Sequence, residues 1–524
     1  MERRFTPGQV RTYAAFGLFF LTFLSLLATI TGPGFGWDEI FYIGSGPSYI
    51  EWFSRIGTDS LQRDTIGEYW QVNHEHPPLA KILIGLAISF WRDSLGFIYA
   101  ARMATVLVMS TLVVVVFLFM ERHFDIKIGL FSAMTLLLMP RVFGHAHLAG
   151  LDLTMALMWF ASTALFAEAV KGNIKWSIAS GLATGAALLT KINALALPPI
   201  LIAWGIFYYR KKALPACLSL LIGIPVFFAG WPWLWVDTFS HLQEFFETLS
   251  SKRTPIPVYY FGRSYGRGST TPVHYPLVIT LATLSVGTLV GLGVAIRIRL
   301  KDYRKNKIEI LLAANAFLIL LSASSPGVPK YDGVRLFLPA FPFIACLAGL
   351  GLSTIHDYLM KHLKDMRKVG AIWAAYLVWL IAGIAWMHPY YLSYYGGLAG
   401  GASGAHKIFG FESTYWGDVV DDQALDFVIE NAPERAGYVI VPHGRLALDN
   451  VLKMQLKEKR PDIREVDFDE AKWDIAVLNC RQGLFNDQAW NLYKQGKPAF
   501  VHKRQGVPLC MIFLRKDQLI NNDE

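Results

Sequence analysis

Apolar runs of about 20 residues recur along most of this 524-residue chain, from Thr12 to His388. A helix rises about 1.5 Å per residue, so about 20 apolar residues cross the ~30 Å hydrocarbon core of a bilayer. The composition is 53% hydrophobic and only 17% charged, which excludes a disordered chain and a nucleic-acid-binding protein. The sequence therefore predicts a polytopic α-helical membrane protein.

Eleven segments meet this length requirement, and we expect about 11 to 13 transmembrane helices because the segment around Lys191 divides in more than one way. The expected spans are 12–31, 97–120, 127–143, 152–170, 174–190, 192–209, 213–232, 273–296, 307–323, 334–353 and 369–387. The apolar segment 79–90 is too short to span and is flanked by prolines and charged residues. It predicts a helix lying in the membrane interface.

Basic residues gather in every second loop, which sets the expected orientation. The basic segments are the N-terminus with Arg3, Arg4 and Arg11, then Arg122 with Lys127, Lys171 with Lys175, 210–212, 297–307 and 361–368. We expect these segments, and with them the N-terminus, to be cytoplasmic. The long segments 32–96, 233–272 and 389–524 then face outward. No Asn-x-Ser/Thr sequence occurs, which favours the plasma (inner) membrane of a bacterium or archaeon.

The chain changes character after the glycine-rich stretch 396–404, which is typical of a linker. Beyond it, helical patterns at 419–430 and 486–494 alternate with strand-like runs at 438–441, 475–479 and 509–514. We therefore expect two domains. Residues 1–395 form the membrane domain, with outer loops 32–96 and 233–272, and residues 396–524 form a small extracytoplasmic (periplasmic or extracellular) α/β domain.

Acidic residues at the outer ends of spans are candidates for catalysis because orientation signals do not explain them. Asp38 and Glu39 follow the first span, and Asp152 begins a later one. A carboxylate at the membrane boundary can act as a general base. The alternatives are that the Asp38-Glu39 pair starts an interfacial helix and that Asp152 caps its own helix.

Histidines occupy two outer corners of the chain. His74, Glu75 and His76 precede Pro77-Pro78, which fix the corner, and His147 belongs to a His-x-His pair with His145 in a tight connection. The corner at His74 to Pro78 suits a lipid phosphate, with a solvated loop as the alternative. Each His-x-His pair supplies two metal ligands without a clear fourth, so a divalent metal cofactor is left open and no cofactor is certain.

Cations on the outer side oppose the topology rule and predict an anion there, such as a lipid phosphate or pyrophosphate. The candidates are Lys191, Arg263 with Arg267, and Arg335 with Lys330. Snorkelling to lipid headgroups is the alternative explanation. The chain has neither a Gly-x-Gly-x-x-Gly motif after a strand nor a Gly-Lys-Ser/Thr phosphate loop, so a lipid-linked donor fits better than a nucleotide.

Several of these motifs, in this order, resemble the protein O-mannosyltransferase and aminoarabinose-transferase group of GT-C glycosyltransferases (dolichyl-phosphate-mannose-protein mannosyltransferase-like). The matching segments are Asp38-Glu39, Glu75-His76-Pro77-Pro78-Leu79, Leu151-Asp152, Gly181 to Leu189-Thr190-Lys191, Arg335-x-x-Leu338-Pro339 and His388-Pro389-Tyr390-Tyr391-Leu392-Ser393-Tyr394-Tyr395. The resemblance implies a GT-C-like catalytic domain that transfers a sugar from a polyprenyl-phosphate donor, with inversion, on the non-cytoplasmic face.

The resemblance also implies roles for individual residues. Asp38 would be the base, with Glu39 and Asp152 positioning acceptor or sugar. The donor phosphate would be held by His76, Lys191, Arg335 and Arg263. The substrate-positioning candidates are Glu75, His74 and His147.

The chain departs from the family pattern at two positions. The aminoarabinose enzymes carry Lys where this chain has His76, and members often have Tyr where it has Leu336. The acceptor, whether protein, lipid or glycan, stays unidentified. The alternative function is a non-catalytic lipid or solute transporter or flippase, which would place ionisable groups and broken helices near the bilayer midplane.

Overall fold

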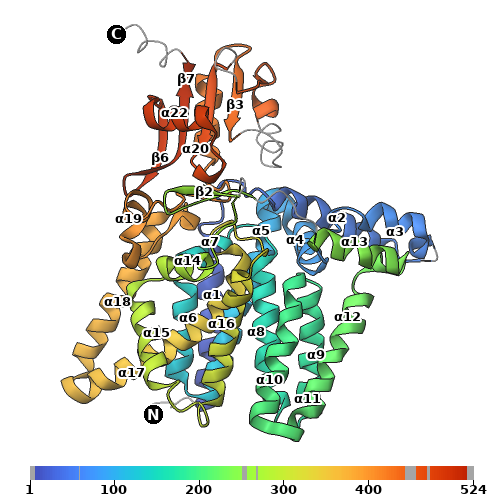
Figure 1. Cartoon of the computed structure of the whole chain (residues 1–524), viewed down its shortest axis with the longest axis vertical. Helices are drawn as coiled ribbons and strands as arrows, with labels where there is room; N and C mark the ends of the chain where they lie inside the picture. The colour runs from blue at the N-terminus through green and yellow to red at the C-terminus, as the bar shows by residue number, and fades with distance from the viewer. Residues whose placement is uncertain are drawn as a thin grey trace.

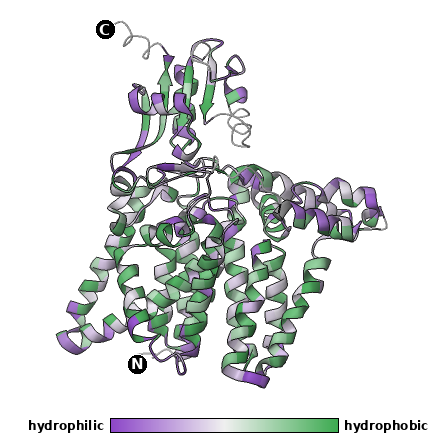
Figure 2. Cartoon of the chain, in the orientation of Figure 1, coloured by the Kyte–Doolittle hydropathy of each residue, from purple (hydrophilic) through white to green (hydrophobic). Residues whose placement is uncertain are grey.

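A bundle of long helices carries a small sheet-containing domain at one end (Figure 1). This computed structural model describes residues 6–57, 59–250, 256–266, 269–442, 456–468 and 473–515. Hydrophobic residues dominate the bundle helices, whereas hydrophilic residues gather at the ends of the bundle and on the sheet domain (Figure 2). The predicted polytopic helical fold with a C-terminal α/β part is confirmed.

Each of the eleven predicted spans coincides with at least one helix. The bundle helices are α1 (Pro7–Leu27), α5 (Phe97–His123), α6 (Ile126–Leu137), α7 (Pro140–His145), α8 (Asp152–Ala169), α9 (Ile174–Leu188), α10 (Leu197–Tyr209), α11 (Leu214–Ser219), α12 (Gly223–Ala229), α14 (Tyr275–Thr283), α15 (Val286–Ile298), α16 (Lys307–Ser324), α17 (Phe341–Leu363) and α18 (Met366–Met387). Short 3₁₀ segments join them: η2 (Ile192–Ala196), η3 (Arg210–Ala213), η4 (Leu220–Ile222), η6 (Arg335–Ala340) and η7 (Tyr391–Ser393).

By length and composition, six helical segments of the described chain qualify to cross a membrane, or seven if α14 and α15, bent by 118°, count as one span. The predicted number of 11 to 13 is therefore not confirmed. α9 has only 15 residues, and α8 carries Asp152 and Glu168 near its two ends, which lowers its hydropathy. One qualifying segment, Ile192–Ala229, reverses at Arg210, where φ is 53°, so α10 packs against α16 while α12 packs against α9.

Four helices and a 3₁₀ turn form a platform across the end of the bundle that faces the sheet domain (Figure 1). They are α2 (Glu39–Ser54), η1 (Asp59–Leu61), α3 (Arg63–Trp70), α4 (Leu79–Leu95) and α13 (Thr238–Ser250). Buried aromatic residues from α2, α3 and η5 (Pro232–Trp235) form the platform's own apolar cluster. The segment expected as an interfacial helix at 79–90 is the first part of α4.

The two ends of the bundle differ as the loop pattern predicts. The described parts of the loops 32–96 and 233–272 and of the C-terminal domain lie at one end, and the connection from α10 to α11 and the described N-terminus lie at the other (Figure 1). Assignment of the basic end to the cytoplasm stays a prediction.

The C-terminal domain contains a five-stranded sheet of order β4-β3-β5-β7-β6. β3 (Gly437–Val441) runs parallel to β4 (Arg464–Glu465) and β5 (Ile475–Asn479), while β7 (Val507–Leu514) is antiparallel to β5 and to β6 (Phe500–Arg504). Two helices, α20 (Asp422–Asn431) and α22 (Asp487–Gln495), accompany the sheet together with the turn η9 (Gln482–Leu484). The three predicted strands and two predicted helices are present.

The glycine-rich stretch 396–404, expected to be a linker, is folded. It forms η8 (Gly397–Ala399) and α19 (Gly401–Lys407), which pack against α14 and β7. A Cβ on Gly396 would lie 2.0 Å from the carbonyl oxygen of Leu284, so glycine permits this close approach. A hairpin of β1 (Val258–Tyr260) and β2 (Arg263–Tyr265) also contacts η9. The apolar core therefore continues from the bundle into one face of the sheet.

Candidate active site

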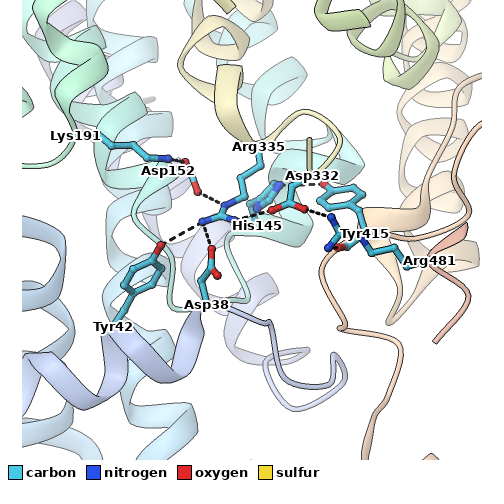
Figure 3. A network of polar contacts seen from close by, with 9 residues as sticks. All are labelled: Asp38, Tyr42, His145, Asp152, Lys191, Asp332, Arg335, Tyr415 and Arg481. Carbon is cyan, nitrogen blue, oxygen red and sulfur yellow. Dashed lines mark hydrogen bonds and ion pairs between the residues drawn. The ribbon is translucent and has the colours of Figure 1, made fainter. Parts of the chain in front are cut away.

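A network of ion pairs lies where the bundle meets the C-terminal domain, with Arg335 at its centre (Figure 3). The Arg335 guanidinium donates from Nε to Asp152 Oδ2 at 2.9 Å and from Nη1 to Asp332 Oδ2 at 2.8 Å. Its Nη2 donates to the Tyr42 hydroxyl at 3.2 Å and pairs with Asp38. All three nitrogens of this one guanidinium are therefore engaged, which fixes its orientation.

Lys191 is the second cation of the network. Its Nζ lies 2.5 Å from Asp152 Oδ1, so Asp152 bridges Lys191 and Arg335. The residues come from separate elements: Asp38 precedes α2, Asp152 begins α8, Lys191 follows α9, and Arg335 begins η6. The sequence-predicted residues Asp38, Asp152, Lys191 and Arg335 thus meet in one network.

Exposure distinguishes Asp38 from its partners. Its side chain is 32% exposed, against 4% for both Asp152 and Arg335. Asp332 is also 4% exposed and Lys191 8%. Of these three carboxylates, only Asp38 is therefore accessible to a molecule arriving from outside the network.

The pKa values of groups around the network follow from burial and charge. Burial raises the pKa of Tyr42 well above 10, and the nearby Asp38 carboxylate raises it further, so Tyr42 keeps its proton. Burial also raises the pKa of Asp332, which Arg481 and Arg335 partly oppose. Burial, and then Lys191 and Lys81, lower the pKa of His76 well below 6.5, so His76 is neutral at pH 7.

Aromatic rings cover the two arginines of the network. The Trp416 ring centroid lies 4.4 Å from Arg335 Cζ, and the Trp37 ring centroid lies 4.1 Å from Arg481 Cζ. The Trp37 amide donates to the Trp416 carbonyl at 3.0 Å, which joins the segment before Asp38 to the segment after α19. These rings keep water away from the ion pairs and strengthen them.

Glu39 lies outside this network although it adjoins Asp38. It is completely buried, and Arg102 donates to both of its oxygens at 3.1 and 3.0 Å. The amides of Ala149 and Gly36 also donate to it, at 2.7 and 2.6 Å. Glu39 therefore joins three segments of the bundle end and does not face the accessible side of Asp38.

The other predicted positioning residues also bind elsewhere. His147 is buried, with Nε2 2.7 Å from Thr29 Oγ1 and Nδ1 2.8 Å from the Phe143 carbonyl oxygen. His74 lies on the platform, where its Nε2 is 2.8 Å from Glu244. Glu75 is exposed on the same corner.

Lys81 holds the corner in place. Its buried ammonium group donates to the carbonyls of Asn73 at 2.6 Å and His76 at 2.7 Å. This contact fixes the backbone of His76, whose ring centroid lies 6.4 Å from that of Tyr42.

Arg263 lies exposed on β2 and outside the network, and Arg267 falls outside the described residues. Lys330 bonds to the backbone carbonyls of Ser325 and Val328. Within the described residues, no three His, Cys, Asp or Glu side chains are arranged to hold a metal ion.

Sequence analysis missed Asp332, Tyr42, Tyr415 and Arg481. Asp332 had a usable signal, since it is an acidic residue three positions before Arg335 and directly before Gly333, in a segment expected on the outer side. Arg481 had none, because it belongs to the C-terminal domain and only the folded structure brings it to the network.

Sequence and structure comparisons relate this site to known proteins. The family model described as dolichyl-phosphate-mannose-protein mannosyltransferase matches residues 75–235, which include His76, Asp152 and Lys191. No curated protein sequence matches the chain significantly.

Solved structures match over almost the whole chain. ArnT from Cupriavidus metallidurans in the apo state has a TM-score of 0.52 at 16% sequence identity, covering 97% of this chain and 98% of ArnT. ArnT bound to undecaprenyl phosphate has a TM-score of 0.50 at 17% identity, covering 96% and 97%. At such identities the likeness establishes the fold. The chain thus has the fold of ArnT and, in residues 75–235, resembles the dolichyl-phosphate-mannose-protein mannosyltransferase family, as its motif order predicts.

Proposed function

We propose that this chain is an integral membrane glycosyltransferase, which moves a sugar from a polyprenyl-phosphate donor to an acceptor at the end of the bundle that carries the C-terminal domain. The observation that carries the proposal is the accessible Asp38 carboxylate paired with the buried Arg335, which Asp152 links to the second buried cation, Lys191. The family model and the ArnT fold support it.

In the proposed reaction, Asp38 accepts the proton of an acceptor hydroxyl while the hydroxyl oxygen attacks the anomeric carbon of the sugar. The bond from that carbon to the phosphate oxygen breaks, and the carrier leaves as polyprenyl phosphate. The accessibility of Asp38 supports its assignment as the base, since a base must reach the proton that it removes.

The departing phosphate gains negative charge, so fixed cations favour the transition state over the ground state. Lys191 and Arg335 are assigned to this task, with His76 beside them. Asp38 and Lys191 lie at opposite ends of the chain of contacts through Arg335 and Asp152 (Figure 3). We propose inversion at the anomeric carbon, which requires that Asp38 and the departing phosphate lie on opposite faces of the sugar.

The lipid nature of the donor is supported by the position of the network at the end of an apolar bundle (Figure 2). One ArnT structure holds undecaprenyl phosphate, a carrier that we propose for this chain as well. We further propose a plasma (inner) membrane location with the C-terminal domain outside the cytoplasm. The sugar is a hexose or pentose, and the acceptor is a protein, a lipid or a glycan.

The proposal is tested with purified full-length protein in liposomes that contain labelled polyprenyl-phosphate donors of mannose or 4-amino-4-deoxyarabinose. Release of polyprenyl phosphate, with the label moved to an acceptor added as an envelope extract, supports a transferase. Movement of intact donor across the bilayer without cleavage would instead identify a lipid transporter. Parallel reactions with EDTA decide whether a divalent metal is needed.

A further inference from the structure

Arg481 is the residue by which the C-terminal sheet reaches the ion-pair network. It follows β5 and directly precedes η9, and its side chain is fully buried although arginine is rarely buried without partners. The network is otherwise built from α2, α8, η6, their flanking segments and Lys191 after α9. Arg481 is therefore the place where the sheet domain can influence the chemistry at the bundle end.

The contacts of Arg481 converge on residues next to the candidate base. Its Nη2 donates to Asp332 Oδ1 at 2.8 Å, and its Nη1 donates to the Tyr415 carbonyl at 2.6 Å. Its guanidinium stacks over Trp37, whose ring centroid is 4.1 Å from Cζ and which directly precedes Asp38. One side chain thus contacts the loop before η6, the segment after α19 and the residue before Asp38.

Asp332 connects Arg481 to Arg335. Its two oxygens are divided between the arginines: Oδ1 accepts from Arg481 and Oδ2 accepts from Arg335 at 2.8 Å. Both oxygens are buried, so without Arg481 the carboxylate would rely on Arg335 alone. Without Arg481, the buried Asp332 carboxylate would attract the Arg335 guanidinium more strongly. Arg335 would then turn away from Asp38 and Asp152.

We propose that Arg481 is a positioning residue of the active site, which holds Asp332 and thereby orients the Arg335 guanidinium that faces Asp38. The C-terminal domain then completes the site in addition to covering it. This inference rests on the proposed transferase activity for its kinetic test, whereas its structural test does not.

The kinetic test compares Arg481→Gln, Arg481→Lys and Asp332→Asn in the full-length protein, with the same mannose and aminoarabinose donors as probes. We expect Arg481→Gln to lower kcat at least tenfold and to change KM for the donor less than threefold, because the guanidinium acts on the orientation of Arg335. Arg481→Lys, which keeps the positive charge beside Asp332, should recover part of kcat.

A double-mutant cycle separates positioning from simple domain docking. If Arg481 acts through Asp332, the double variant Asp332→Asn with Arg481→Gln has a kcat no lower than the poorer single variant, because with the Asp332 charge already removed Arg481 has no carboxylate through which to act on Arg335. Effects that multiply would contradict the proposal, as would a loss of activity proportional to the loss of folded protein. Lys459→Gln is the matched control, because Lys459 forms an exposed ion pair with Asp426 in the same domain. This variant should leave kcat unchanged.

A structural readout decides the inference even if wild-type protein releases no polyprenyl phosphate, a result that would itself contradict the proposed function. Hydrogen exchange should quicken in Arg481→Gln at the amides of Arg335 and Phe337, which bond to Asp332 and Val334, and stay unchanged across α17. Unchanged exchange at these two amides would overturn the proposed positioning role.

Discussion

At the scale of single residues, Asp38 and Glu39 are adjacent in the chain but have opposite surroundings. Successive positions at the start of a helix point about 100° apart. Asp38 therefore faces Arg335 and the accessible side, while Glu39 points inward to Arg102. We infer that Glu39 stabilises the bundle end and that Asp38 carries the chemistry.

The role of Glu39 predicts the effect of Glu39→Gln. Removing the charge leaves Arg102 buried without its partner, which should cost about 3–5 kcal/mol of stability. Thermal unfolding in detergent should therefore shift to lower temperature, while kcat per folded molecule stays within about threefold of wild type.

The control for this variant is Glu51→Gln on the same helix. Glu51 pairs with Arg55 at the exposed surface, so its loss should cost less than about 1 kcal/mol. Wild-type stability together with a lost kcat in Glu39→Gln would contradict the structural role and support the catalytic role that the sequence predicted.

Sequence reasoning identified residue types and positions but not pairings. Asp38, Asp152, Lys191 and Arg335 stood out because charges at the outer ends of spans are costly. Glu39 stood out for the same reason. Its partner Arg102 lies 63 positions away and looked like an ordinary helix residue, so the sequence did not indicate that the charge of Glu39 is neutralised. Whether a charge is free or neutralised depends on contacts that no local pattern encodes.

At the scale of elements, the platform is set by a close crossing of α2 and α4. A Cβ on Gly85 would lie 2.3 Å from the Gly46 carbonyl oxygen, so glycine at both positions lets the two backbones touch. This crossing places Tyr42 and Asp38, on or before α2, relative to Lys81 on α4. The geometry of the site therefore depends on the contact between Gly46 and Gly85, which lies about one to two helical turns from Asp38 and Tyr42.

Gly85→Ala tests the crossing. The added methyl group cannot be accommodated without separating the helices, so we expect a loss of about 1–3 kcal/mol of stability and a lower kcat. Gly44→Ala is the matched control on α2, because its Cβ would meet nothing within 4 Å. Alanine there should be neutral or stabilise by up to about 1 kcal/mol. Equal effects of the two variants would refute this account of the platform.

The apolar pattern predicted where helices lie but not where they bend. The expected span at 273–296 is one apolar run, yet the chain breaks at Leu284 and turns by 118°. Ser285 caps the second helix by accepting from the Thr288 amide at 3.2 Å. A serine within an apolar run is a weak signal, and packing of Gly396 against Leu284 helps to settle the bend.

At the scale of the whole molecule, the part of the C-terminal domain next to the bundle contains buried carboxyl groups, one of them beside Arg481. Glu412 is buried and accepts from the Gly483 amide at 2.9 Å. Burial raises its pKa from 4.5 to about 7, although Arg481 opposes the shift. Asp418 is also buried, and burial raises its pKa to about 7. The docked state therefore favours protonated carboxyl groups.

The raised pKa of Glu412 predicts how the stability of Glu412→Gln, relative to wild type, changes with pH. The unfolded Glu412 loses its proton near pH 4.5 and the folded one near pH 7, so the wild type loses stability as the pH rises through this window. Glutamine stays neutral, so the Tm of Glu412→Gln relative to wild type should rise from pH 4.5 to 7 and then level off. Asp426→Asn, at an exposed carboxylate, is the control. A Tm difference between Glu412→Gln and wild type that does not vary with pH would contradict the raised pKa of Glu412.

The sequence predicted the order of parts across the whole molecule and the fold class, because hydropathy and strand patterns are local. It did not predict that the glycine-rich stretch packs against the bundle or that Arg481 enters the ion-pair network. Both features depend on how the sheet domain docks, which brings together residues more than 100 positions apart, such as Asp332 and Arg481.

The central claim is that Asp38 assists cleavage of the bond between a sugar and its polyprenyl-phosphate carrier. The most direct measurement is mass spectrometry of the lipid bound to purified wild type and to Asp38→Asn after incubation with a polyprenyl-phosphate sugar and an acceptor extract. We predict polyprenyl phosphate on the wild type and intact donor on Asp38→Asn, with cleavage slowed about 10²–10⁴-fold. Equal cleavage by both proteins, or donor left intact by the wild type, would contradict the account.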